Sequence, residues 1–134
     1  MPAAHMFHEK DPQSRILEEV GDLSGVEIFN NQVLCAVYRR PEKTKGGILL
    51  PGSNLDEDKY QSKVGLILKM GASAFKPDSE WFKGVSFSEH DWVVFRPSDG
   101  WSITVKTNDG GEVLCRIIDD VHVKGRVSHP DHVW

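Results

Sequence analysis

Short runs of β-branched, aliphatic and aromatic residues fill most of the chain after about residue 26. Runs of this length and composition are typical of β-strands. The residues between them carry turn chemistry, as in Asn30-Asn31 and residues 97–100. Several short strands with frequent turns favour a mainly β domain, either a small sandwich or a partly closed barrel. The expected strands span residues 33–38, 62–70, 92–96, 102–106 and 112–118.

A short helix is predicted before this region. Asp11 has the side chain of a helix cap, and Pro12 suits the first helical position. Gly21 provides a stop signal. A helix of two to three turns is marginal alone, so its apolar side must dock on its own domain or on a neighbour. The apolar stripe consists of Ile16, Leu17 and Val20.

Length and composition fit a single ordinary globular domain, since the chain has 134 residues, of which 39% are hydrophobic and 27% charged. The net charge of -4 argues against nucleic acid as a partner, because phosphate binding requires clustered lysine and arginine. No apolar run approaches the roughly 20 residues that span a bilayer. The N-terminus shows no secretory signal, and only two cysteines are present. We therefore expect a cytoplasmic protein without membrane contact.

Both cysteines are predicted to be core residues. Cys35 and Cys115 each lie inside an apolar run, where cysteine behaves as a small hydrophobic residue. A disulfide would require their strands to be neighbours with suitable Cβ spacing, which the sequence alone leaves open.

The chain divides into three expected parts: an N-terminal arm with a short helix over residues 1–25, a β-barrel domain over residues 26–125, and a tail over residues 126–134. Aromatic residues also interrupt a polar stretch between residues 71 and 88. Rings in such a loop either cover an edge of the core or contact another subunit. The residues expected in oligomer or arm contacts are Phe7, Ile16, Leu17, Val20, Phe75, Trp81, Phe82 and Trp134.

One apolar triplet lies in an unusual setting, between a glycine pair and Pro-Gly, with lysines upstream. Glycine pairs give a flexible backbone. An apolar triplet in a flexible, charged segment is typical of a binding loop for a hydrophobic groove on another protein. The local alternative is a buried strand over residues 48–50, entered through a turn. The candidate partner-binding residues are Gly46, Gly47, Ile48, Leu49, Leu50 and Pro51.

The sequence contains no strong catalytic pattern. It lacks the motif of a nucleophile elbow and that of a Gly-rich phosphate loop. His5 and His8, like His129 and His132, are three residues apart, but they lie on the termini without the supporting carboxylate or cysteine pattern of a metal site. The acidic residues 56–58 and 119–120 lack the alternating pattern of a calcium loop. We therefore predict no enzyme activity, no metal and no cofactor.

Several segments, in the same order, resemble the co-chaperonin family, the GroES-like lids of chaperonins. The most specific match is the sequence KTKGGILLP at residues 43–51, which is similar to the family's mobile loop. The similarity spans roughly residues 26–124. The segments that resemble the family's strands and turns are residues 33–39, 63–71, 90–95 and 112–121.

This resemblance implies a GroES-like, partly closed β-barrel without enzyme activity. It also implies a homo-oligomeric ring, a heptamer in the family, in which the triplet Ile48-Leu49-Leu50 contacts the chaperonin ring.

Four features depart from the family pattern. The usual proline, acidic and basic residues before the first strand are replaced by VEIFNNQ at residues 26–32. About 25 residues precede that strand, and the tail after residue 125 is additional. The family's dome hairpin is replaced by the aromatic stretch at residues 72–87. These differences favour a divergent, phage-type member. They also keep open an alternative, a structural or decoration protein of a viral capsid or another symmetric particle, which would be found in the virion.

Overall fold

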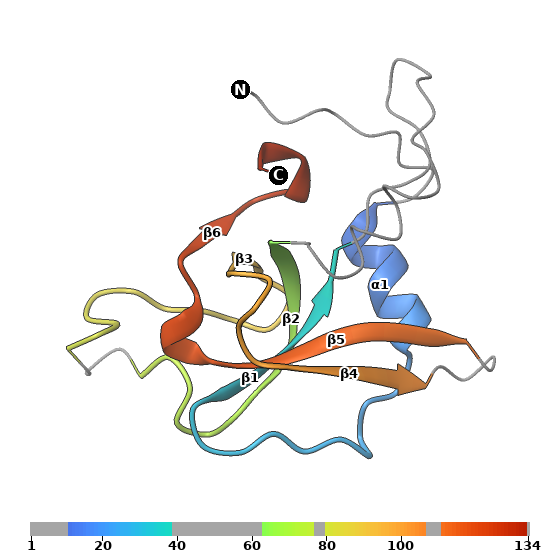
Figure 1. The fold of residues 1–134 in the computed structure, drawn as a ribbon, viewed down its shortest axis with the longest axis horizontal. Helices are drawn as coiled ribbons and strands as arrows, with labels where there is room; N and C mark the ends of the chain where they lie inside the picture. The colour runs from blue at the N-terminus through green and yellow to red at the C-terminus, as the bar shows by residue number, and fades with distance from the viewer. Residues whose placement is uncertain (1–10, 39–62, 77–79, 107–110, 134) are drawn as a thin grey trace.

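The structure is a computed structural model that describes residues 11–38, 63–76, 80–106 and 111–133. In this part of the chain, one α-helix precedes six β-strands and two 3-10 helices (Figure 1). The elements are α1 (Pro12–Val20), β1 (Gln32–Val37), β2 (Val64–Met70), β3 (Trp92–Val94), β4 (Trp101–Lys106), β5 (Glu112–Asp119), η1 (Asp120–His122), β6 (Gly125–Val127) and η2 (Pro130–His132).

The six strands form a single antiparallel sheet in the order β4-β5-β1-β2-β3-β6. Within the described residues β4 and β6 are its two edges, so the sheet does not close into a complete barrel. In Figure 1 the β2 arrow crosses β4 and β5 steeply, as expected for a strongly twisted small sheet. The structure confirms the prediction of a mainly β domain with a short N-terminal helix.

Helix α1 begins and ends at the predicted signals. The Asp11 side chain accepts a hydrogen bond from the backbone N–H of Ser14 (3.2 Å), which satisfies one of the free donors of the first turn. At the other end Gly21 has a φ of 60°, a backbone conformation that favours glycine. Ile16 and Val20 are each only 2% exposed and pack into the protein's own core. The helix therefore docks on its own domain.

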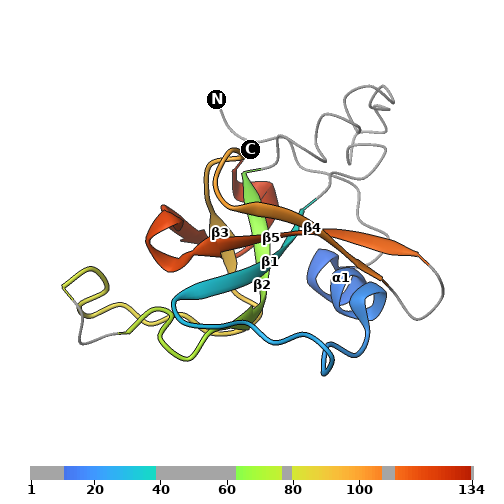
Figure 2. The ribbon, with the colours of Figure 1, turned by 60° about the horizontal axis from the view of Figure 1, so that its bottom comes forward.

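The sheet has a core layer on each face. The first layer joins α1 to residues such as Leu34, Leu66 and Cys115. The second joins Cys35 and Val93 to aromatic residues from the connection between β2 and β3. The helix thus covers one face of the sheet and the aromatic connection covers the other. In Figures 1 and 2 the yellow part of that connection extends away from the sheet, at the opposite end of the molecule from α1.

The prediction that both cysteines are core residues is confirmed, because Cys35 and Cys115 are fully buried free thiols. Their strands, β1 and β5, are neighbours, but Cys115 lies opposite Ala36 and Cys35 lies opposite Arg116. The two cysteines also belong to different core layers. Burial raises the pKa of the Cys115 thiol to about 12 and that of Cys35 still further.

The strand predictions locate five of the strands and differ from the structure mainly at strand ends. Strand β3 stops at Val94, whereas residues 92–96 were expected. The sequence pattern does not indicate β6, and Arg126 and Val127 fall in the predicted tail, but both lie in a strand that pairs with β3. The candidate strand at residues 48–50 lies outside the described residues.

Candidate partner-binding surface

The connection between β1 and β2 leaves and re-enters the sheet at one place. Val37 lies opposite Gly65, and the Tyr38 N–H donates a hydrogen bond to the Val64 carbonyl (3.0 Å). Tyr38 is 1% exposed, and its ring meets that of Trp92 edge to face at 5.8 Å. Both ends of the connection are therefore anchored in the core. Residues 39–62, including the predicted partner-binding residues Gly46, Gly47, Ile48, Leu49, Leu50 and Pro51, lie outside the described residues.

The connection between β2 and β3 carries a cluster of three phenylalanines. The Phe75 ring stacks on Phe87, with ring centroids 4.3 Å apart, and meets Phe82 edge to face at 5.2 Å. Phe75 and Phe82 are buried, at 3% and 6% exposure, and pack against the sheet. Aromatic pairs in these geometries add stabilisation beyond the area they bury. The cluster therefore fixes residues 80–88, here named the aromatic loop, onto the domain.

Two charged side chains hold the same region from other elements. The Asp120 carboxylate, in η1, accepts hydrogen bonds from the Phe75 N–H (2.9 Å) and from the Asn31 side-chain amide (3.1 Å). The Arg126 guanidinium, in β6, lies 4.9 Å from the centroid of the Phe87 ring and donates a hydrogen bond to the Ser86 carbonyl. Residues distant in sequence thus set the conformation of the aromatic loop.

A glycine fixes the beginning of this connection. A Cβ on Gly71 would lie 2.3 Å from the Asn30 carbonyl oxygen, closer than any side chain tolerates. The Gly71 N–H donates a hydrogen bond to the Gln32 carbonyl (2.8 Å). The chain therefore leaves β2 directly against the turn that precedes β1.

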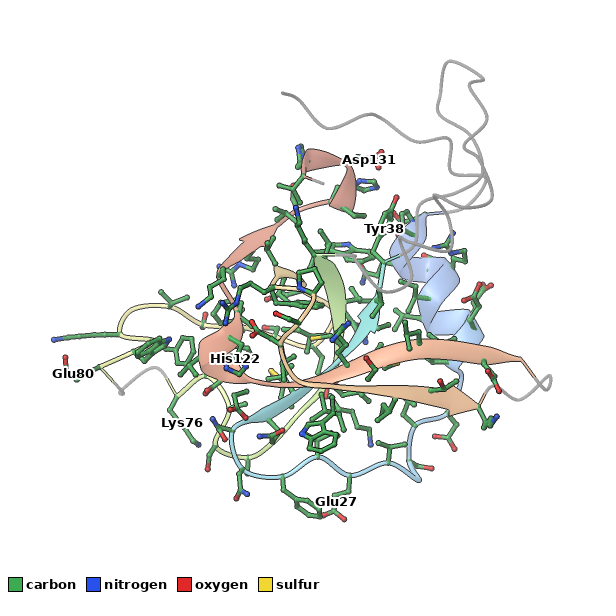
Figure 3. The ribbon with its side chains drawn as sticks, in the orientation of Figure 1. Glu27, Tyr38, Lys76, Glu80, His122 and Asp131 are labelled. Carbon is green, nitrogen blue, oxygen red and sulfur yellow. The ribbon has the colours of Figure 1, made fainter. Side chains whose placement is uncertain are left out.

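The aromatic loop presents apolar side chains to solvent. Trp81 is 66% exposed and Val85 is 41% exposed. The other large hydrophobic residues exposed in the described ranges are Phe29 and Trp101. In Figure 3 Lys76 and Glu80, which both come before Trp81 in the chain, lie far from Tyr38, which marks the base of the β1–β2 connection.

The predicted contact residues fall into three groups. Phe7 and Trp134 lie outside the described residues. Ile16, Val20, Phe75 and Phe82 are buried inside the protomer, and Leu17 is partly buried against the same core, so the packing of these five is intramolecular. Among the six residues of the set that the structure describes, Trp81 alone is exposed. No pattern in the sequence singles out Val85, Phe87 or Arg126.

Comparison with known families identifies the domain. Residues 26–122 match the family described as the chaperonin 10 Kd subunit. The chain belongs to the chaperonin 10 Kd subunit family. No curated protein matches the chain. The match includes β1 to β5 and η1, and therefore also the two connections described above.

Membership of the chaperonin 10 Kd subunit family supports a co-chaperonin-like role carried out through protein partners. Co-chaperonins of this family are not enzymes. The α1 helix and the β6–η2 segment lie outside the family match, yet both pack onto the matched domain. In this family member, therefore, additional segments cover one face of the sheet and pair with the β3 edge.

The buried charged groups of the family domain form structural contacts. The Arg116 guanidinium donates to the Asp99 backbone carbonyl (3.1 Å), and the Asp99 carboxylate accepts from Arg96 (3.1 Å). Hydrogen bonds from Arg96 hold the pKa of the Asp99 carboxyl below its ordinary value. Burial lowers the pKa of the Arg116 guanidinium, an effect that the Asp99 charge opposes. These groups fix the turn at residues 97–100 against β5.

The histidines spaced three apart, His129 and His132, are associated with η2. His129 Nδ1 accepts a hydrogen bond from the Asp131 N–H (3.1 Å) and so caps that short helix. In the described ranges, no group of three or more histidine, cysteine or acidic residues could hold a metal ion. None of the helices described there is long and apolar enough to cross a membrane.

Proposed function

We propose that this protein is a chaperonin lid, in which a ring of identical copies each offers the triplet Ile48-Leu49-Leu50 to an apolar groove on the chaperonin. The observation that carries the proposal is the family match over residues 26–122, which includes the segment KTKGGILLP. The sheet supports this assignment, because β1 and β2 are adjacent and anchor both ends of the connection that carries the triplet.

Simple energetics favour a ring over a single copy. Complete burial of an aliphatic side chain contributes about 1.5–3 kcal/mol. Fixing the backbone of a flexible segment costs about 1–2 kcal/mol per residue. The two contributions largely offset each other, so one triplet binds weakly. Several triplets on one rigid ring bind well, because each contact after the first is intramolecular. Weak individual contacts also allow the lid to dissociate.

The alternative, decoration of a capsid or another symmetric particle, predicts arms that reach neighbouring molecules. The described parts of the two terminal segments instead fold back onto the protein's own domain, as the burial of Ile16 and Val20 and the pairing of β6 with β3 illustrate. This packing supports the lid proposal. Native mass measurements separate the two functions, because a lid forms a free ring of a few copies, whereas a decoration protein remains a smaller species until it meets the particle.

The direct test mixes the protein with a chaperonin and nucleotide and measures capped complexes by pull-down and electron microscopy. Leu49→Asp places a charge in the triplet, so we expect loss of chaperonin binding with the oligomer intact. Leu55→Asp is the matched control, because it adds the same charge to the same connection outside the triplet. Undiminished binding by Leu49→Asp would eliminate the proposed contact.

A further inference from the structure

A path of side-chain contacts runs from the base of the β1–β2 connection to the last strand of the sheet. The Tyr38 ring meets the Trp92 ring edge to face at 5.8 Å, and Trp92 lies directly opposite Val127 of β6. Residues opposite one another in an antiparallel pair have side chains on the same face, close enough to interact. Tyr38 and Trp92 are 1% and 4% exposed, and Val127 packs against the core layer that contains both rings. Strands β1, β3 and β6 therefore meet at this base.

Strand β6 also covers an edge that would otherwise be open. Within the described residues, β3 has β2 on one side and β6 on the other. Val64, where β2 begins, lies opposite Val94, and Val94 lies opposite Gly125, so β6 joins the sheet at the level at which the connection re-enters it. The Lys124 N–H donates to the Val94 carbonyl (2.7 Å) and extends this pairing. Without β6, the backbone of β3 beside Trp92 would be a sheet edge.

The residues after β6 fold over the same end of the sheet. His129 Nδ1 accepts a hydrogen bond from the Asp131 N–H (3.1 Å) and caps η2, in which Asp131 is buried. Val133, the residue after η2, packs against the core layer that contains Tyr38. Figures 1 and 2 show η2 beside the beginning of β2, and in Figure 3 Asp131 lies at the same end of the molecule as Tyr38. Residues 125–133, here named the clamp segment, thus cover the base of the connection.

We propose that the clamp segment positions the base of the β1–β2 connection for partner binding. This connection carries the triplet of the proposed chaperonin contact, so the inference rests on the proposed function. The clamp segment itself lies outside the family match, which ends at residue 122. A binding segment whose two ends are held in one arrangement loses less conformational freedom when it binds. Val127 and Val133 are therefore positioning residues, which act on the partner contact through the buried rings at its base.

The test compares full-length variants that remove apolar contacts from the clamp segment. Val127→Ala and Val133→Ala, the two clamp variants, each shorten a partly buried side chain that packs on the first core layer. Val123→Ala is the matched control, because Val123 is also a partly buried valine but packs against the second core layer. Val133→Ile is the conservative variant, because it keeps a β-branched apolar side chain at the contact.

Hydrogen exchange at two backbone amides reports on the base directly. The Tyr38 N–H donates to the Val64 carbonyl (3.0 Å), and the Phe95 N–H donates to the Lys63 carbonyl (2.9 Å). We expect exchange at both amides to accelerate about tenfold in the clamp variants, because local opening becomes easier. Exchange at the Asp120 N–H, which is hydrogen bonded at the start of η1, should stay at the wild-type rate and so distinguish local from global loosening.

Chaperonin binding supplies a readout that a purely structural role would leave unchanged. We expect the clamp variants to bind a chaperonin, in the presence of nucleotide, about threefold to tenfold more weakly than the wild type. Their native mass should equal that of the wild type, so that the loss is one of binding and not of assembly. Val123→Ala and Val133→Ile should bind like the wild type.

Unchanged exchange at Tyr38 and Phe95 in both clamp variants would overturn the inference, and so would an equal acceleration in Val123→Ala. Faster exchange with undiminished binding would also overturn it, because the segment would then only cover the edge of the sheet. A wild-type chain that binds no chaperonin would instead contradict the proposed function, and the exchange rates would still decide whether the clamp segment holds Tyr38 in place.

Discussion

The guanidinium of Arg126 lies 4.9 Å from the centroid of the Phe87 ring and joins the last strand of the sheet to the aromatic loop. The same side chain bonds to the Ser86 carbonyl and to the Asp91 carboxylate. A planar cation over a ring combines electrostatic attraction with close packing, and at exposed sites it contributes about 0.5–1 kcal/mol. One residue of β6 therefore links two segments that are far apart in the sequence.

Arg126→Ala is expected to loosen the aromatic loop and to lower the free energy of unfolding by about 1–2 kcal/mol, because a cation–π contact and hydrogen bonds are lost together. Hydrogen exchange should accelerate at the amides of residues 86–91. Urea unfolding and hydrogen-exchange mass spectrometry measure the two effects. Lys124→Ala is the matched control, because it removes a positive charge from the same segment at an exposed position.

Arg126→Lys separates charge from shape. Lysine retains the charge but lacks the planar group that lies over the ring, so an intermediate effect is expected. Exchange at residues 86–91 that is the same in all three variants and the wild type would show that Arg126 does not hold the loop.

Ile16→Ala is expected to lower the free energy of unfolding by about 2–5 kcal/mol, the usual range for truncation of a buried aliphatic side chain. Ile16 is 2% exposed and packs in the first core layer, although α1 lies before the residues that match the family. Leu17→Ala, at a partly buried position of the same helix, should cost distinctly less. Chemical denaturation of both variants makes the comparison. Equal, small effects would mean that α1 is not part of the domain's core.

The helix and most strands were predictable because their signals are local. Asp11 caps the first turn of α1 and Gly21 ends it, as the sequence indicates. Strand ends were less predictable, because they depend on partners. Phe95 was expected inside a strand; its backbone still donates to the Lys63 carbonyl (2.9 Å), but β3 ends one residue earlier.

The arrangement of the candidate surface was only partly predictable. The aromatic residues of the β2–β3 connection are evident in the sequence, and so is the choice between covering the core and contacting a subunit. The structure shows that Phe75 and Phe82 cover the core while Trp81 faces solvent. The role of Arg126 has no local signal, because it depends on a three-residue strand that lies beside β3.

Acid should weaken the fold through Asp99, whose carboxylate accepts hydrogen bonds from Arg96. These bonds hold the folded-state pKa below the ordinary aspartate value of about 3.9. Because the folded pKa is the lower one, the contribution is present above about pH 4 and is lost as the pH falls through the folded value.

Urea unfolding of the wild type and Asp99→Asn at several values between about pH 6 and about pH 3 measures this loss. We expect the difference between the two free energies of unfolding to shrink as the pH falls. Asp22, whose pKa is lowered mainly by the Ser24 backbone hydrogen bond, is common to both proteins and cancels in that difference. Parallel pH profiles would contradict a stabilising role for the Asp99 charge.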